Sequence, residues 1–257
     1  MKILLFFILI LIFWALIIEP YIITVKKIKI QDKSLAGLKI VFATDFHYKK
    51  YEKFRLKRDV KKINQQNPDI ILLGGDFVNG HRQGNALNHE IIGMEFGKLR
   101  SKHGTFAVLG NHDVWQDAAG ISESLRKNNI TVLKNSNAKS GPIYIAGVED
   151  LQTQKPDIEK ALKNTSAPRI LLTHTPDVIE EVPKTVNLTL AGHLHGGQVN
   201  FPFLGAVTTP SKYGTKYAYG LFDVNGRKMF VSKGIGTSIL PIRFLCPPQI
   251  VVFEFFE

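Results

Sequence analysis

Leu-Lys-Ile-Val-Phe-Ala-Thr-Asp-Phe-His, residues 38–47, joins a short apolar run directly to two side chains that can bind a metal, Asp45 and His47. The same arrangement returns four more times. Apolar runs cover residues 69–75, 105–110, 169–173 and 188–192, and they are followed in turn by Asp76, by Asn111, His112 and Asp113, by His174, and by His193 and His195. Such runs are typical of buried strands in a parallel sheet, so we predict an α/β protein.

The five polar clusters are expected to meet at one edge of the molecule. Open α/β sheets place their ligands beyond the carboxyl ends of the strands. Asp45 and His47 are two residues apart, as are His193 and His195, so on an extended strand end each pair would project to one side. Aspartate, asparagine and histidine together form a mixed oxygen and nitrogen set that suits two borderline divalent ions such as Mn, Fe or Zn.

Five motifs occur in a fixed order: Asp-Phe-His (45–47), Gly-Asp-Phe-Val-Asn (75–79), Gly-Asn-His-Asp (110–113), the isolated His174 and Gly-His-Leu-His (192–195). Through them the chain resembles the calcineurin-like metallophosphoesterases. The resemblance continues through residues 196–202 and 232–249, which look like a subgroup of small membrane-associated or exported bacterial phosphoesterases, including enzymes that cleave UDP-2,3-diacylglucosamine. Gln249 stands where glutamate is expected in a Pro-Pro-Glu motif.

The resemblance implies a four-layer sandwich of two mixed β-sheets flanked by helices, and a hydrolase of phosphoric esters or pyrophosphates. It also implies two divalent metal ions. One ion would be held by Asp45, His47, Asp76 and His195, and the other by Asp76, Asn111, His174 and His193. A carboxylate shared by both ions makes electrostatic sense, because two dications about 3.5–4 Å apart repel each other.

Four further predictions concern the substrate. We expect His112 to donate a proton to the phosphate or the leaving group, with Asp113 orienting His112 and favouring its protonated form. Asn111 and His112 are expected to contact the substrate. Arg243 could clamp a second phosphate or form a structural ion pair, and His81 could reach the substrate from a loop.

Residues 1–25 are predicted to form a membrane anchor and residues 26–257 the catalytic domain. Ile3 to Ile18 carry no charge, and the apolar character resumes at Tyr21. A cleaved signal peptide and an interfacial amphipathic anchor are alternatives, but the small residues of a signal cleavage site are missing. Four lysines follow the apolar segment: Lys26, Lys27, Lys29 and Lys33. By the positive-inside rule they place the catalytic domain on the cytoplasmic side of a bacterial inner membrane.

The formal net charge of the 257-residue chain is +11, and basic residues crowd into positions 26–62. They are expected to form the solvated face of a helix or to contact anionic lipid, since such a cluster gains about 1 kcal/mol per residue near a charged bilayer. Nucleic acid is a weaker alternative, because aromatic and basic residues are not interleaved. The single cysteine, Cys246, excludes an intramolecular disulfide.

Periodicity predicts the remaining elements. A helix near 52–66 should turn Phe54, Val60 and Ile63 inward. Asn225-Gly226 is typical of a type I′ hairpin. Further helices are expected over 85–100, 122–128 and 157–164, and further strands over 143–148 and 250–255.

Three functions are compatible with these features. The first is a membrane-anchored dinuclear phosphohydrolase that cleaves a phosphodiester or pyrophosphate of a lipid-linked substrate, such as UDP-2,3-diacylglucosamine in lipid A synthesis. The second is a phosphodiesterase on soluble or cell-wall phosphodiesters. The third is a catalytically silent scaffold, which the complete ligand set argues against. The oligomeric state is not predicted.

Overall fold

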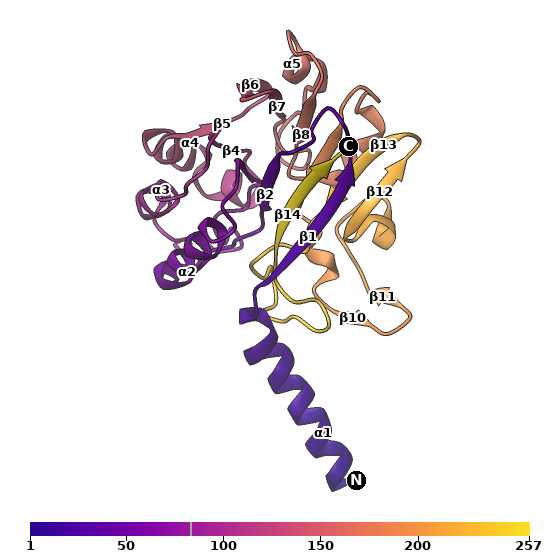
Figure 1. Cartoon of the computed structure of the whole chain (residues 1–257). Coiled ribbons are helices and arrows are strands. Elements are labelled where there is room, and N and C mark those ends of the chain that lie inside the picture. Colours follow the sequence, from indigo (N-terminus) through magenta and orange to yellow (C-terminus); the bar gives the residue numbers. More distant parts are fainter. Residues whose placement is uncertain (83) are drawn as a thin grey trace.

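Two six-stranded mixed sheets pack face to face in the computed structural model, which describes residues 1–82 and 84–257 (Figure 1). The first sheet has the strand order β1 (Thr24–Gln31), β14 (Gln249–Phe256), β2 (Lys39–Ala43), β3 (Ile70–Leu73), β4 (Thr105–Ala107) and β5 (Ile130–Val132). The second has the order β12 (Gly220–Val224), β13 (Arg227–Val231), β9 (Leu188–Ala191), β8 (Arg169–Leu172), β7 (Ile143–Gly147) and β6 (Ser136–Ser140).

The central strands run parallel, as their apolar sequences predict. β2, β3, β4 and β5 pair in parallel, and so do β7, β8, β9 and β13. β3, β8 and β9 are buried along almost their whole length because both faces of each sheet are covered. A large core cluster between the sheets contains Phe42, Leu72, Ile170 and Phe253. The carboxyl ends of strands from both sheets therefore open toward one seam.

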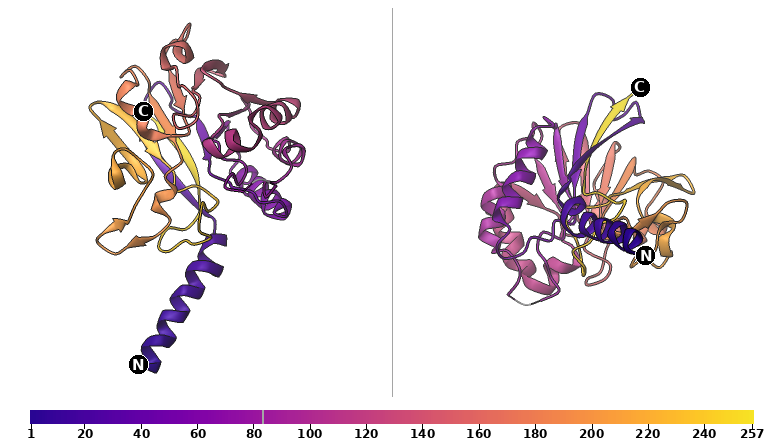
Figure 2. Two further views of the ribbon diagram at one scale, coloured as in Figure 1. Left: turned by 180° about the vertical axis from the view of Figure 1, so that it is seen from behind. Right: turned by 90° about the horizontal axis from the view of Figure 1, so that it is seen from below.

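Helices cover the outer face of each sheet, which completes the predicted four layers (Figure 2). α2 (Lys53–Asn64), α3 (His89–Phe96) and α4 (Asn111–Lys127) pack on the first sheet. The second sheet is covered by α5 (Ile158–Leu162) and by the 3-10 turn Pro176–Glu181. A small hairpin of β10 (Asn200–Phe201) and β11 (Gly205–Ala206) lies outside both sheets.

Most predicted elements are confirmed, with three corrections. Phe54 does not face inward but is 83% exposed, and Leu56 takes its place beside Val60 and Ile63 in the core. α3 is shorter than the predicted helix over 85–100, and α4 begins at Asn111 and is kinked at Asp117, so the predicted helix over 122–128 corresponds only to the part after the kink. Asn225 and Gly226 both have positive φ, 54° and 81°, and turn β12 into β13 as their sequence predicts.

The N-terminal helix α1 (Lys2–Phe13) projects away from the two sheets (Figure 1). It continues through a wider helical turn, Trp14–Ile18, and a 3-10 turn, Glu19–Tyr21. Within the described residues, Lys2–Tyr21 is one helix that is long and apolar enough to cross a membrane. β1 starts three residues later and joins the helix directly to the edge of the first sheet.

Candidate metal centre

Loops at the carboxyl ends of five strands place the predicted ligands at the seam between the sheets. Asp45, Asp76 and Asn111 follow strands β2, β3 and β4 of the first sheet. His174 follows β8, and His193 and His195 follow β9, so the second sheet supplies these histidines. All seven predicted ligand side chains, His47 included, are buried. The expectation that the five polar clusters meet at one rim is therefore confirmed.

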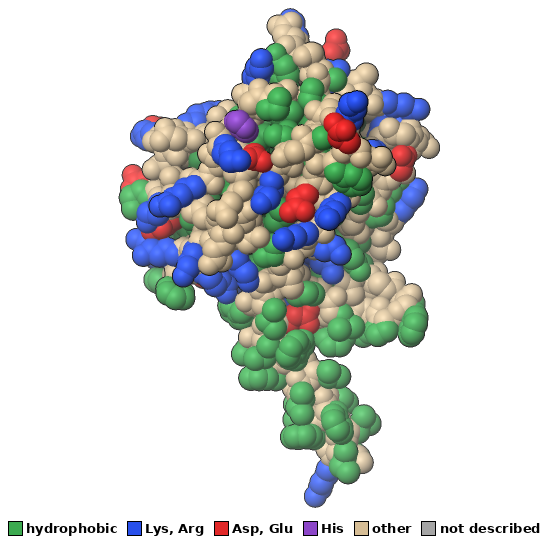
Figure 3. Space-filling model, in the orientation of Figure 1, with side chains coloured by type: hydrophobic (Ala, Val, Ile, Leu, Met, Phe, Trp, Pro, Cys, Tyr) green, Lys and Arg blue, Asp and Glu red, His purple; other side chains and the backbone are tan. Residues whose placement is uncertain are grey.

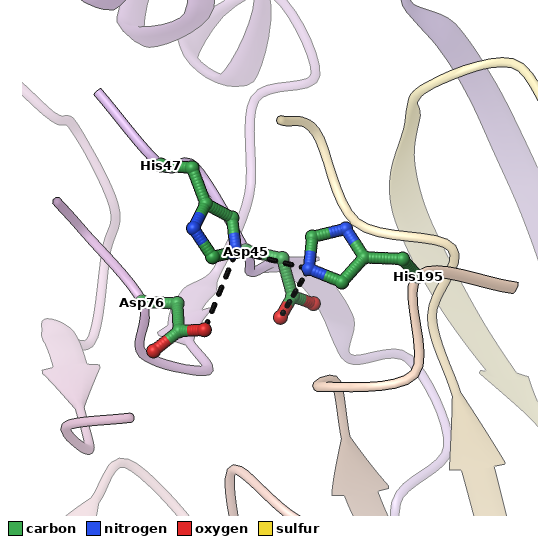
Figure 4. A group of neighbouring side chains, drawn as sticks. All are labelled: Asp45, His47, Asp76 and His195. Atoms are coloured by element: carbon green, nitrogen blue, oxygen red, sulfur yellow. Dashed lines mark hydrogen bonds and ion pairs between the residues drawn. The ribbon is translucent and has the colours of Figure 1, made fainter. Parts of the chain in front are cut away.

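Four of these side chains form a first group (Figure 4). Nε2 of His47 lies 2.9 Å from Nε2 of His195 and 3.3 Å from Oδ2 of Asp76. Nε2 of His195 lies 3.7 Å from Oδ1 of Asp45. One potential ligand atom from each of the four residues falls within 4.8 Å of all the others, which is close enough to surround one ion.

A second group surrounds Nε2 of His174. This atom lies 3.1 Å from Oδ1 of Asn111, 3.2 Å from Nδ1 of His193 and 3.3 Å from Oδ2 of Asp76. Asp76 Oδ2 is thus 3.3 Å from a histidine nitrogen in each group, His47 in the first and His174 in the second. Asp76 occupies the position that a carboxylate shared by two ions requires.

The polar atoms at this seam fit divalent metals. Oδ2 of Asp45 and Nε2 of His193 are buried and have no hydrogen-bond partner among the described residues. Burial holds the pKa of both His47 and His195 well below its ordinary value, so their imidazoles are neutral, as metal binding requires. Desolvation by burial raises the pKa of Asp45 to about 7. A dication beside Asp45 would offset that desolvation.

Asp76 and His174 behave as an ion pair in this network. Burial opposes the charge of Asp76, but the nearby His174 holds its pKa well below the usual range. Burial likewise opposes the charge of His174, and Asp76 raises the His174 pKa well above its ordinary value. The negative charge of Asp76 is therefore stable where the two groups meet, and a metal ion held by His174 would take the place of the His174 proton.

The backbone conformation that points the ligand side chains toward the seam differs from the predicted one. The ligand pairs do not lie on extended strand ends. Five ligands have left-handed backbone conformations instead, with φ of 56° at Asp45, 48° at His47, 53° at Asp76, 71° at His193 and 51° at His195. Residues other than glycine rarely adopt this region, and such residues cluster at functional sites. Each loop turns sharply after its strand and aims its side chain back into the seam.

His112 lies beside this group and is held by a backbone contact. Its Nδ1 accepts a hydrogen bond of 2.8 Å from the N–H of Gly80, so a neutral His112 carries its proton on Nε2. Burial lowers the His112 pKa to about 4. The predicted protonated form is therefore wrong. The ring centroids of His112 and His47 are 4.4 Å apart.

Asp113 does not orient His112, in contrast to the prediction. Its Oδ1 accepts hydrogen bonds from the N–H groups of Phe77 (2.8 Å) and Val78 (3.2 Å), and its Oδ2 accepts one from Gly110 (3.0 Å). Burial raises the Asp113 pKa to about 7. Asp113 therefore fixes the loop after Asp76 against the start of α4, and Gly80 takes the predicted orienting role.

Arg243 is buried, and it forms no ion pair with the described residues. Its guanidinium donates to the backbone oxygens of Gly236 (3.0 Å), Lys233 (2.8 Å) and Cys246 (2.9 Å). The prediction of substrate binding at Arg243 is thus wrong, because the loop of residues 233–246 folds around the side chain. Arg243 holds that loop in shape.

A cavity of about 350 Å³ opens over the two groups. Asp76, Asn111, His112, His193 and His195 form its polar floor. His81 is predicted to reach the substrate, and its side chain also lines the cavity, with Nε2 2.9 Å from Oγ of Ser238. Other lining residues were not singled out from the sequence, since distant loops bring them together: Trp115, Gln152, Leu194, Gln198, Thr208, Thr209, Pro210, Ser238 and Ile239. A larger hollow beside α5 is lined by none of these residues.

Residues 38–197 match the family model of the calcineurin-like phosphoesterases. The chain belongs to this family. A Bacillus subtilis relative, "uncharacterized metallophosphoesterase YkuE", is 33% identical over 93% of this chain and 88% of its own length. The Escherichia coli "phosphodiesterase YaeI" is 31% identical over 85% of this chain and 82% of its own length. A zebrafish "transmembrane protein with metallophosphoesterase domain" is 30% identical over 85% of this chain and 53% of its own length.

This metallophosphoesterase is a metal-dependent hydrolase of phosphoric esters. Bound divalent ions supply positive charge for the phosphate oxygens and lower the pKa of a bound water. The chain's own contribution is to hold the ligands before the metal arrives and to line the cavity with the imidazole of His112, whose tautomer Gly80 fixes. A neutral Nε2–H is a suitable hydrogen-bond donor to a phosphate oxygen or to the leaving group.

Proposed function

We propose that this chain is a membrane-anchored hydrolase of phosphodiesters or pyrophosphates that uses two divalent ions. The observation that carries the proposal is the position of Asp76, whose Oδ2 lies 3.3 Å from a histidine nitrogen on each side. One ion is assigned to Asp45, His47, Asp76 and His195, and the other to Asp76, Asn111, His174 and His193. Mn, Fe and Zn all suit this donor set.

His112 is assigned to the substrate. It lines the cavity next to the ligand Asn111, and its ring can donate from Nε2 to an equatorial or leaving oxygen of the phosphate. Phosphoryl transfer depends mainly on positioning and on charge stabilisation, which these groups provide. Asn111 can contact the same phosphate through its amide.

We infer a lipid-linked substrate from the apolar N-terminal segment, with UDP-2,3-diacylglucosamine as the first candidate and its hydrolysis to a lipid monophosphate and UMP as the reaction. The basic residues after the segment favour a single-pass protein of the bacterial inner membrane with its catalytic domain in the cytoplasm. A phosphodiesterase of soluble substrates is the second candidate, since the Escherichia coli relative is named a phosphodiesterase.

The test uses the full chain in detergent with added Mn²⁺. The purified protein is incubated with the nucleotide-linked lipid and with bis-p-nitrophenyl phosphate, and the products are identified by mass spectrometry. Activity on both substrates, lost in Asp76→Asn, supports the proposal. Activity on the aryl diester alone would refute the nucleotide-lipid assignment, and no metal-dependent activity on either substrate would refute the hydrolase.

A further inference from the structure

Lys2–Tyr21 is long enough to cross a bilayer, but only part of it is free of the catalytic domain. Side chains from Ile3 to Ile17 are exposed, except that of Ala15, and Glu19 and Pro20 are buried. At 1.5 Å per residue, Ile3 to Ile17 span about 22 Å of a hydrocarbon core that is about 30 Å thick. The remaining depth lies where the end of the helix packs against the catalytic domain.

A single loop of the catalytic domain surrounds this end of the helix. The backbone oxygen of Ala15 accepts a hydrogen bond of 2.9 Å from the N–H of Arg243. The carboxylate of Glu19, itself 3% exposed, accepts hydrogen bonds from the N–H groups of Leu245 (3.0 Å) and Cys246 (2.5 Å). These contacts fix the loop of residues 233–246 against the end of the helix. The loop therefore lies at the same membrane depth as the last apolar turns of the helix.

That loop and the adjacent hairpin expose large apolar side chains. Asn200 of β10 donates to the oxygen of Phe244 at 2.9 Å, so the β10–β11 hairpin is tied to the same loop. Figure 3 shows apolar side chains gathered around the base of the helix, on the surface from which the hairpin projects. We call the following exposed residues the apolar collar: Phe201, Phe203, Leu204, Val207, Ile239, Leu240 and Leu245.

Three residues of the apolar collar have strained backbone conformations. Phe203, Ile239 and Leu245 have φ of 66°, 59° and 53°, in the left-handed region that bulky residues avoid. Gln198 holds the loop with two hydrogen bonds to the backbone of Ser238, of 2.9 Å and 2.7 Å. Soluble surfaces rarely expose so many contiguous apolar side chains, and such patches mark contacts with proteins or membranes.

We propose that the apolar collar is inserted in the lipid bilayer and that the catalytic cavity opens at the level of the head groups. A lipid occupant follows from the missing depth of the helix and from the apolar residues placed at that depth. Basic side chains flank the same end: Arg58 donates to the oxygen of Tyr21 at 3.3 Å and Lys62 to that of Ile23 at 2.5 Å. Such residues suit the anionic head groups that surround an inserted surface.

The collar is continuous with the cavity, which defines how a substrate reaches it. Ile239 belongs to both, Ser238 precedes it in the cavity wall, and Thr208 follows the collar residue Val207 into the same wall. The substrate class is therefore a phosphodiester or pyrophosphate whose acyl chains stay in the bilayer while its phosphate enters the cavity. Water adds to phosphorus, the P–O bond to the leaving group breaks, and the leaving oxygen takes a proton. This substrate class rests on the proposed function, whereas the insertion does not.

Insertion is tested on the full chain by site-specific labelling. Cys246 is the single cysteine and is fully buried, so Phe203→Cys introduces the reactive thiol for a nitrobenzoxadiazole label. The protein is reconstituted in vesicles of phosphatidylethanolamine and phosphatidylglycerol. Phe256→Cys is the matched control, because Phe256 pairs with Gln31 at the end of β1 that is about 23 Å from the helix.

We expect spin-labelled lipids to quench the label at position 203 and not at position 256. Quenching at both positions by aqueous iodide, with no effect of the lipid quencher, would overturn the insertion. This result does not depend on any hydrolase activity, so it separates the insertion from the proposed function.

The access route is tested with two substrates that release the same leaving group. Bis-p-nitrophenyl phosphate is soluble, and the p-nitrophenyl ester of phosphatidic acid is held in vesicles. We expect Phe203→Ser/Leu204→Ser to lower hydrolysis of the lipid ester by about tenfold while the soluble rate stays within about twofold. Phe256→Ser should change neither. An equal loss on both substrates, or a loss on neither, would overturn the route, and an inactive wild-type protein would refute the hydrolase itself.

Discussion

Replacement of Gly110 by alanine should disable the metal centre without changing any ligand. A β-carbon at Gly110 would lie 2.7 Å from Cε1 of His174 and 2.8 Å from Cγ of Asp76. Carbon atoms in contact lie about 3.5–4.0 Å apart, so one or both ligands must move by roughly 1 Å. The backbone of Gly110, with φ −101° and ψ 178°, is accessible to alanine, so the effect is steric.

A displacement of this size sets the expected loss. Misplacing reacting groups by about 1 Å costs on the order of 100-fold in rate, which corresponds to ~2.7 kcal/mol of transition-state stabilisation. We expect kcat/KM for bis-p-nitrophenyl phosphate to fall by about this factor with Mn²⁺ present. Bound manganese, measured by elemental analysis, should fall as well, because Asp76 belongs to both ligand groups.

Gly120→Ala is the matched control. Its nearest side chains, Asp117 and His89, form an ion pair on the surface of α4 and α3, so their displacement would disturb a surface contact and not the metal centre, and this variant should keep full activity. The reasoning would be refuted if Gly110→Ala folded normally and kept kcat/KM within about threefold of the wild type, with an unchanged manganese content.

Three further predictions test separate parts of the site. His112→Ala should lower kcat by about 10²-fold or more at unchanged metal content, whereas His89→Ala at the surface should not; equal activity of the two variants would remove His112 from the reaction. Arg243→Met should lower the free energy of unfolding in urea by roughly 3 kcal/mol or more, because it leaves buried carbonyl groups unpaired, while Arg100→Met, at an exposed position, should be neutral. Removal of metal with EDTA should abolish hydrolysis and lower Tm by about 5 °C or more, both restored by Mn²⁺; an unchanged Tm would argue against ions at the buried ligands.

The order of strands and ligands could be predicted because each signal is local. A short apolar run followed by Asp45, Asp76 or His174 contains both the strand and the ligand that its end presents, and the sheet brings these ends together. These features need no knowledge of distant loops. The division of the strands into two sheets is expected only from the family resemblance, because an apolar run shows that a strand is buried and not which sheet it joins.

Other features depend on contacts that local sequence does not contain. Phe54 is a different case, because Leu56, Val60 and Ile63 are spaced i, i+4 and i+7 and share one face of α2, whereas Phe54 lies on the opposite face, so the helical period itself selects Leu56. Arg243 looks like a phosphate ligand until the loop of residues 233–246 closes around it with three backbone oxygens. Asp113 sits next to His112 in sequence, but helix α4 turns its carboxylate toward Phe77 and Val78.

Left-handed backbone at five ligands carries an evolutionary consequence. A residue with a β-carbon costs about 1 kcal/mol there relative to glycine. The five positions together therefore lower the free energy of unfolding by roughly 5 kcal/mol, as much as the whole stability of some domains. A lineage released from selection for hydrolysis would lose about 1 kcal/mol of backbone strain each time glycine replaced Asp45, His47 or His193. Glycines accumulating at these positions would therefore mark descendants that have abandoned chemistry and kept the scaffold.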